Sequence, residues 1–343
     1  MQTRKIWVNT IIFIAIIILL FALLLHGENP QEVWNSICSA QPGFVVMGMV
    51  LAFTFNLAEG MNLRILLRTF GCTVSFSQSM KYAFTGFFFS SITPSSTGGQ
   101  PMQLYMMKKD GISLSHGTLA LLVELLSFQF SAFLLECGAA VRMIFMPVSM
   151  SPLMQTLAVV GFALNSAFII VLVLVILSEK AGNKILYLTE KVICILPVMK
   201  QSTKEKLAGN LKDGFREYHS CAILMKEKKS VTAKVVGISI IQVLAWFSIP
   251  FVIYMALGGQ AGQYWNLLLL QILLYMISAL LPLPGAVGIN ELAFLNLFLM
   301  VYKRTQIKAA VLLTRGISFY FLLFVNGALL LLIILSEKRK SAR

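Results

Sequence analysis

Residues 90–101 read SSITPSSTGGQP, and residues 282–291 read PLPGAVGINE. Each stretch places prolines, glycines and polar residues inside a segment that is otherwise apolar enough for a membrane helix. Non-helical backbone is tolerated at membrane depth only where protein or a water-filled cavity covers it. Paired interruptions in the two halves of a chain are typical of transporters, in which they mark the binding site.

Composition indicates a polytopic membrane protein. The 343 residues are 58% hydrophobic and 12% charged, whereas about 25% is usual in a soluble domain. The net charge of +14 is interpreted as positive-inside topology and contact with anionic membrane lipids, and no direct nucleic-acid partner is expected. The five cysteines and three histidines are scattered, and no enzyme motif is present. We therefore predict no metal site, no cofactor and no catalytic residue.

Apolar spans of about 20 residues predict membrane crossings. Six are expected, near residues 6–25, 43–62, 117–139, 153–177, 235–257 and 309–335. The first is expected to be a retained signal anchor, because no small-residue cleavage site follows it. The two interrupted segments, 77–107 and 264–302, are predicted to be re-entrant helical hairpins.

The distribution of Lys and Arg predicts the orientation. Basic residues at both ends and throughout residues 178–234 place both termini and this loop in the cytoplasm. Hairpin 77–107 then enters from the cytoplasm and hairpin 264–302 from the exterior. The fold class is therefore predicted as an all-α membrane protein with an inverted repeat, its two units spanning 43–139 and 235–335.

The basic loop 178–234 contains apolar residues at helical spacing. Two amphipathic helices are predicted there, lying on the inner leaflet against anionic headgroups. A docking surface for a partner protein is the alternative.

The first break has the composition of a phosphate-binding loop. Glycines allow the backbone to turn, and exposed N–H groups beside hydroxyls suit a phosphate. The candidate residues are Thr93, Ser95, Ser96, Thr97, Gly98, Gly99 and Gln100. Lys108 and Lys109 would attract an anionic headgroup. The alternative is a packing motif, because small residues also let helices approach closely.

The second break contributes the candidates Gly285, Gly288, Asn290 and Glu291. Glu291 would start the following helix, where a carboxylate meets the positive helix end. It is therefore a helix cap, a ligand for the cationic part of a headgroup or a proton carrier, and the sequence leaves these roles open.

Ionisable residues within membrane segments are costly and call for an explanation. Glu124 and Arg315 occupy matching positions in the two units, so an ion pair between them is one candidate; local pairing or snorkelling is the other. Glu59 is assigned a headgroup-level role, Glu136 is expected to reach water, and Gln129 would extend a polar path from Glu124.

These breaks resemble the signatures of the lysylphosphatidylglycerol synthase transmembrane-region family. The first signature is carried by residues 93–101 together with Tyr105 and residues 109–111, and the second by the pattern P-x-P-G-x-x-G-x-x-E over 282–291. Glu124 and Arg315 also fall where this family tends to have intramembrane charges. Ala286 departs from the family, which often has Gly there.

The resemblance implies a flippase-like protein of the bacterial plasma membrane that moves a phospholipid, such as lysyl-phosphatidylglycerol, between leaflets and is linked to cationic-peptide resistance. A phosphatidylglycerol lysyltransferase, or a membrane subunit of one, is the alternative. The chain ends eight residues after Leu335, so the soluble transferase domain would have to be a separate partner. A membrane scaffold is the third reading.

Overall fold

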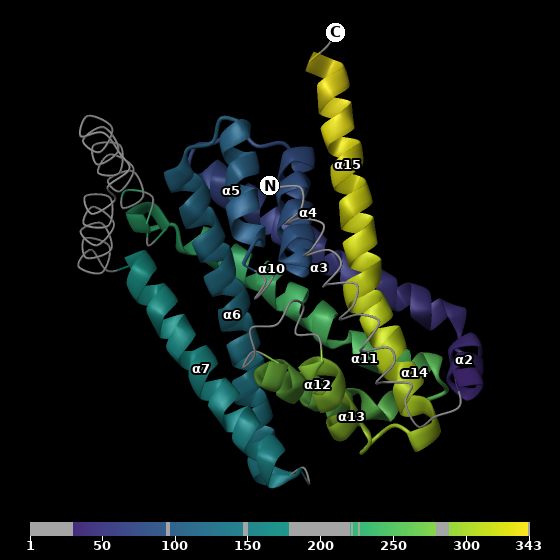
Figure 1. Ribbon diagram of the computed structural model, residues 1–343. Coiled ribbons are helices and arrows are strands. Elements are labelled where there is room, and N and C mark those ends of the chain that lie inside the picture. The colour runs from purple at the N-terminus through teal and green to yellow at the C-terminus, as the bar shows by residue number, and fades with distance from the viewer. Residues whose placement is uncertain are drawn as a thin grey trace, which may run out of the picture.

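The computed structural model describes residues 30–93, 97–146, 150–177, 220, 222–225, 227–278 and 288–341. All regular secondary structure within these residues is helical (Figure 1). The α-helices are α2 (Pro30–Cys38), α3 (Pro42–Thr69), α4 (Phe76–Ile92), α5 (Gly99–Lys109), α6 (Leu114–Phe145), α7 (Pro152–Leu177), α10 (Lys229–Phe247), α11 (Ile249–Ala256), α12 (Tyr264–Ser278), α13 (Ile289–Phe298), α14 (Arg304–Arg315) and α15 (Leu322–Ser341).

Five stretches of the described chain are long and apolar enough to cross a membrane: Pro42–Thr69, Leu114–Phe145, Pro152–Ile176, Lys229–Ala256 and Arg304–Ser336. They coincide with five of the six predicted crossings. The sixth, residues 6–25, lies outside the described residues. The predicted class, an all-α membrane protein, is confirmed.

The first interrupted segment forms a helical hairpin of α4 and α5, which pack against each other. Ser75 caps α4, because its hydroxyl accepts from the Gln78 N–H at 3.2 Å while Gln78 Oε1 accepts from the Ser75 N–H at 2.9 Å. After α5, Gly111 takes a φ of 84°, the left-handed conformation that ends a helix. The arms have 17 and 11 residues, about 25 and 17 Å, so neither spans a hydrocarbon core of about 30 Å.

The second interrupted segment forms a hairpin of α12 and α13, with arms of 15 and 10 residues. The connection, residues 279–287, lies outside the described residues, and Gly285 with it. Figure 1 shows α4 and α5 toward the end of the molecule that holds the C-terminus, and α12 and α13 at the opposite end. The hairpins therefore occupy opposed ends of the helix bundle.

Helices from the two halves of the chain pack into one body. α3 lies against α10 and α11, and α4 lies against α15. Buried amides join the halves: Asn56 Nδ2 donates to Asn326 Oδ1 at 2.7 Å, and Asn62 Nδ2 donates to Ser239 Oγ at 2.9 Å. Polar pairs of this kind hold helices together where hydrophobicity alone supplies no driving force.

The element order is the same in both predicted units: a long helix, a hairpin and a long helix. In the second unit the last helix contains a π-helical turn, Gly316–Phe321, between α14 and α15. The inverted repeat itself stays a prediction. Of the predicted amphipathic loop, most residues lie outside the described ranges, but Ala222 and Met225 are buried in a cluster with residues of α3 and α6, so the end of this loop packs on the helix bundle.

Candidate functional site

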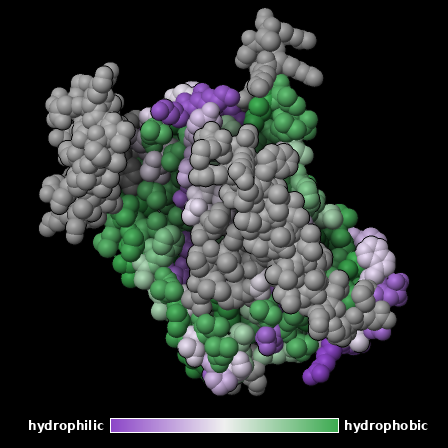
Figure 2. Space-filling model, viewed as in Figure 1, coloured by the Kyte–Doolittle hydropathy of each residue, from purple (hydrophilic) through white to green (hydrophobic). Residues whose placement is uncertain are grey.

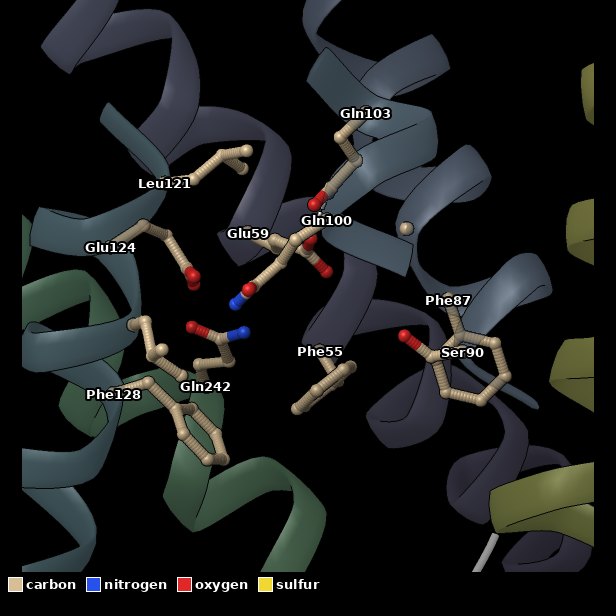
Figure 3. A pocket seen from close by; sticks show the side chains of 12 residues that line it. Phe55, Glu59, Phe87, Ser90, Gln100, Gln103, Leu121, Glu124, Phe128 and Gln242 are labelled. Atoms are coloured by element: carbon tan, nitrogen blue, oxygen red, sulfur yellow. Dashed lines mark hydrogen bonds between the residues drawn. The ribbon is translucent and has the colours of Figure 1, made fainter. Parts of the chain in front are cut away.

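A cavity of about 200 Å³ lies between the first hairpin and the long helices α3, α6 and α10. Figure 3 shows the side chains of Glu59, Gln100, Gln103, Glu124 and Gln242 converging on one space, with aromatic rings below them. The lining is completed by Phe55, Gly86, Phe87, Ser90, Leu121, Leu125 and Phe128. The site therefore combines two carboxylates and three amides with an apolar wall.

An amide donor holds one of the carboxylates in place: Gln103 Nε2 donates to Glu59 Oε1 at 2.7 Å. Gln242 lies beside the other carboxylate, Glu124 (Figure 3). Gln242 is 1% exposed, and its Oε1 has no hydrogen-bond partner among the described residues. No Lys or Arg belongs to the described lining, so the cavity presents acceptor oxygens without an opposing cation.

Glycine allows the two arms of the first hairpin to meet beside this cavity. A Cβ on Gly99 would lie 2.6 Å from the Gly86 carbonyl oxygen and 2.1 Å from Ser90 Oγ. A Cβ on Gly86 would lie 2.2 Å from Gln103 Nε2. Gly99 therefore serves close packing, which is the alternative that the sequence left open for this glycine.

The backbone at the first break is already engaged by a side chain. The Gly98 N–H donates to Thr93 Oγ1 at 2.9 Å, and the same hydroxyl donates to the Phe89 carbonyl at 2.6 Å. The predicted phosphate cradle thus lacks a free N–H at Gly98. Gln100 lines the cavity, Thr97 is exposed, and Ser95 and Ser96 lie outside the described residues.

Lys108 and Lys109 are exposed on the last turn of α5. They lie nine and ten residues after Gly99, about 14 Å along the helix axis, at the open end of the hairpin. The neighbouring Asp110 closes this end: it accepts from Lys81 Nζ at 2.9 Å and from the Tyr82 hydroxyl at 2.6 Å. Lys81 is 1% exposed, a buried cation that the sequence analysis did not single out.

At the second hairpin, Glu291 makes two bonds. Its Oε2 accepts from the Gly288 N–H at 2.6 Å and its Oε1 accepts from Arg315 Nε at 2.7 Å. Gly288 has a φ of 95°, which permits the turn into α13. Asn290 Nδ2 donates to Ser278 Oγ at 3.2 Å and joins the two arms. Glu291 is thus a helix cap and half of a buried ion pair.

The Glu124–Arg315 ion pair suggested by the sequence is not formed. Arg315 pairs with Glu291 and lies with its guanidinium 4.9 Å from the centre of the Phe319 ring, while Glu124 lies at the cavity with Gln242. Each charge has a nearer neighbour: Arg315 pairs with Glu291 in its own half of the chain, and Glu124 lies beside Gln242 of α10.

The structure also changes the locations that the sequence analysis assigned to Glu59 and Glu136. Glu59 lies ten residues before the end of α3, because that helix continues to Thr69, and it therefore lines the cavity instead of reaching headgroup level. Glu136 is 0% exposed and accepts from Asn165 Nδ2 at 2.9 Å, so it does not reach water.

The sequence analysis missed Glu59, Gln103 and Gln242 as cavity residues. An intramembrane charge at Glu59 was a usable signal. Neutral glutamines in apolar helices gave only a weak one, since such residues also serve as interhelical packing contacts.

Comparisons with known proteins agree with the fold. The UPF0104 membrane protein of Archaeoglobus fulgidus is 24% identical over 285 residues, covering 81% of this chain and 82% of that protein. UPF0104 membrane protein PH1989 of Pyrococcus horikoshii is 22% identical over 334 residues, covering 93% of this chain and 96% of that protein. No solved structure gives a significant match. Residues 10–325 match the family described as the lysylphosphatidylglycerol synthase TM region, and the chain therefore belongs to this family.

Proposed function

We propose that this protein moves a phospholipid between the leaflets of its membrane, with the polar headgroup passing through the cavity beside the first hairpin. The observation that carries the proposal is the cavity itself: Glu59, Glu124 and Gln242 converge there, between helices that are long and apolar enough to span the membrane. A polar headgroup has to be sheltered from hydrocarbon in such a place, while its acyl chains remain in lipid.

The surface around the first hairpin supports an entry route from the end that holds Lys108 and Lys109. Figure 2 shows hydrophilic residues at that end and, below them, a narrow hydrophilic strip that runs beside a hydrophobic surface. Exposed lysines at a membrane face attract anionic lipid, with a gain of about 1 kcal/mol for each basic residue near the surface. Under the predicted topology, this is the cytoplasmic side of a bacterial plasma membrane.

The two polar centres have different parts in this proposal. The cavity of the first hairpin receives the headgroup, because no Lys or Arg among the described residues that line it neutralises its acceptor oxygens. The Glu291–Arg315 pair at the second hairpin holds the opposite end of the bundle together, because both charges already have partners.

Reconstituted protein in liposomes tests the proposal. Phosphatidylglycerol and its lysyl form, each carrying a fluorophore, are placed in the inner leaflet, and their exposure to an external quencher is followed with time. We expect the protein to accelerate exposure, and Glu124→Gln to reduce that acceleration about tenfold or more, equivalent to about 1.4 kcal/mol on the rate-limiting barrier.

Glu32→Gln is the matched control, because Glu32 is an exposed acid on α2, away from the cavity lining. Its activity should equal that of the wild type. No acceleration of either lipid by folded protein would contradict the proposal and favour the membrane-subunit or scaffold reading. Equal activity of Glu124→Gln and Glu32→Gln would remove the cavity from the mechanism.

A further inference from the structure

A second polar network lies outside the headgroup cavity, where α6, α7 and α12 meet. The Tyr275 hydroxyl donates to Gln129 Oε1 at 2.7 Å, Gln129 Nε2 donates to Asn165 Oδ1 at 2.9 Å, and Asn165 Nδ2 donates to Glu136 Oε1 at 2.9 Å. All three bonds run in one direction. The chain of donors starts at the phenol of α12 and ends at the carboxyl of α6.

Glu136 is the terminal acceptor and is fully enclosed. It is 0% exposed, and its Oε2 has no hydrogen-bond partner among the described residues. Its bonded partner, Asn165, is neutral and 7% exposed. A carboxylate in such surroundings would carry a full negative charge with only one neutral donor to stabilise it. Burying such a charge costs free energy, and a buried acid avoids this cost by taking up a proton. With Oε1 occupied by Asn165, the proton has its place on Oε2.

Among the described residues, the groups that face Glu136 supply no positive charge to compensate its own. Asn165 comes from α7 and Tyr275 from α12, and the Cys137 thiol on α6 is also in electrostatic contact with it. On the α3, α5 and α10 side of α6, the acids of the headgroup cavity lie near Glu124, twelve residues or about 18 Å earlier along the helix. Arg142, farther along α6, hydrogen-bonds Asn266.

We propose that Glu136 is a proton-binding site within the membrane, which takes up a proton on Oε2 and returns it to water. When Glu136 loses its proton, it becomes negatively charged. Asn165, Gln129 and Tyr275 must then rearrange to stabilise this charge where α6, α7 and α12 meet. The protonation of Glu136 is therefore linked to how α7 and α12, the first arm of the second hairpin, pack on α6. The proposal does not depend on which lipid, if any, the protein moves.

Infrared difference spectroscopy of the full chain in detergent tests this directly. Spectra are recorded at a series of pH values, in H₂O and in D₂O, and the carbonyl band of protonated carboxylic acids is followed. We expect this band to contain a component that declines as the pH rises and shifts in D₂O because its proton exchanges. That component should be absent from Glu136→Gln and present in Glu124→Gln, because the cavity acids contribute to the band separately. Glutamine keeps the Oε1 acceptor and imitates the neutral acid in shape, so the variant should fold.

Two further variants make the assignment specific. Asn165→Leu removes the donor to Oε1, so the band should remain but move to another frequency. Glu227→Gln is the control, because Glu227 is an exposed acid just before α10, and the buried-acid band should be unchanged. Three results would overturn the proposal: no loss of band intensity in Glu136→Gln relative to the wild type, the same loss in Glu227→Gln, and a Glu136-dependent component that neither titrates nor shifts in D₂O.

Discussion

The two hairpins share a shape but differ in how their acids are neutralised. In the first, Glu59 and Glu124 share a cavity whose described lining contains amides and no cation. In the second, Glu291 is bonded by Arg315 and by the Gly288 N–H. A charge with its own protein partner stabilises one arrangement, whereas acceptors without one are available to a ligand. The comparison separates the proposed binding site from a structural ion pair.

The hairpins also differ in how their arms are joined. The arms of the first meet through glycine contacts between α4 and α5, while those of the second are linked by the Asn290–Ser278 hydrogen bond. The following substitutions test these differences through the thermal unfolding midpoint in detergent, from the largest expected effect to the smallest.

Breaking the second hairpin's ion pair should have the largest effect. Arg315→Leu leaves Glu291 buried without its cation, and we expect a loss of about 3 to 5 kcal/mol. The double variant with Glu291→Leu should recover much of this loss, because no lone charge remains, although α13 loses its cap. An Arg315→Leu protein as stable as the wild type would show that the pair is not a structural element.

Filling the glycine contact of the first hairpin should come second. Gly99→Val forces a side chain against the Gly86 carbonyl, and overpacking of this kind costs about 1 to 3 kcal/mol. Gly237→Val on α10 is the control, because a Cβ there meets nothing within 4 Å. Equal unfolding midpoints for the two variants would contradict the close approach of α4 and α5.

Removing the Thr93 hydroxyl should have a smaller effect. Thr93→Val frees the Gly98 N–H from its bond, and a typical loss for one hydrogen bond is about 0.5 to 1.5 kcal/mol. The same variant sharpens the lipid proposal: if the freed N–H can bind a phosphate, phosphatidylglycerol should protect this variant from heat more than it protects the wild type. Thr73→Val, at an exposed threonine between α3 and α4, is the control.

The smallest change in stability is expected for a substitution in the cavity, and it should be a slight gain in stability instead of a loss. Glu124→Gln removes one of two neighbouring carboxyl groups, so the unfolding midpoint should stay level or rise slightly, while lipid movement falls. Glu291→Gln should instead lower the midpoint, since Arg315 would lose its counter-charge. A destabilised Glu124→Gln protein would contradict the distinction between the two hairpins.

Much of the architecture could be predicted from the sequence. Apolar length located five helices that are long and apolar enough to cross a membrane, and proline and glycine within apolar segments located both hairpins. These signals are local, because hydrocarbon thickness fixes the helix length and interrupted backbone hydrogen bonding fixes the breaks. The start of a helix near Glu291 also followed from local signals, whereas the cap was one of three roles that the sequence left open for this residue. The role of Gly99 did not, because phosphate binding and close packing both use glycine.

The sequence by itself determined that this chain is a helical membrane protein with two interrupted segments and a small number of intramembrane charges. Only the tertiary structure decided which charges meet. Glu59 reached the cavity because α3 extends to Thr69 and packs against α10, and Arg315 paired with Glu291 because α13 and α14 lie together. Glu136 became enclosed because α7 brings Asn165 against it. Pairing of this kind depends on helix rotation and packing between distant segments, which no single stretch of sequence encodes.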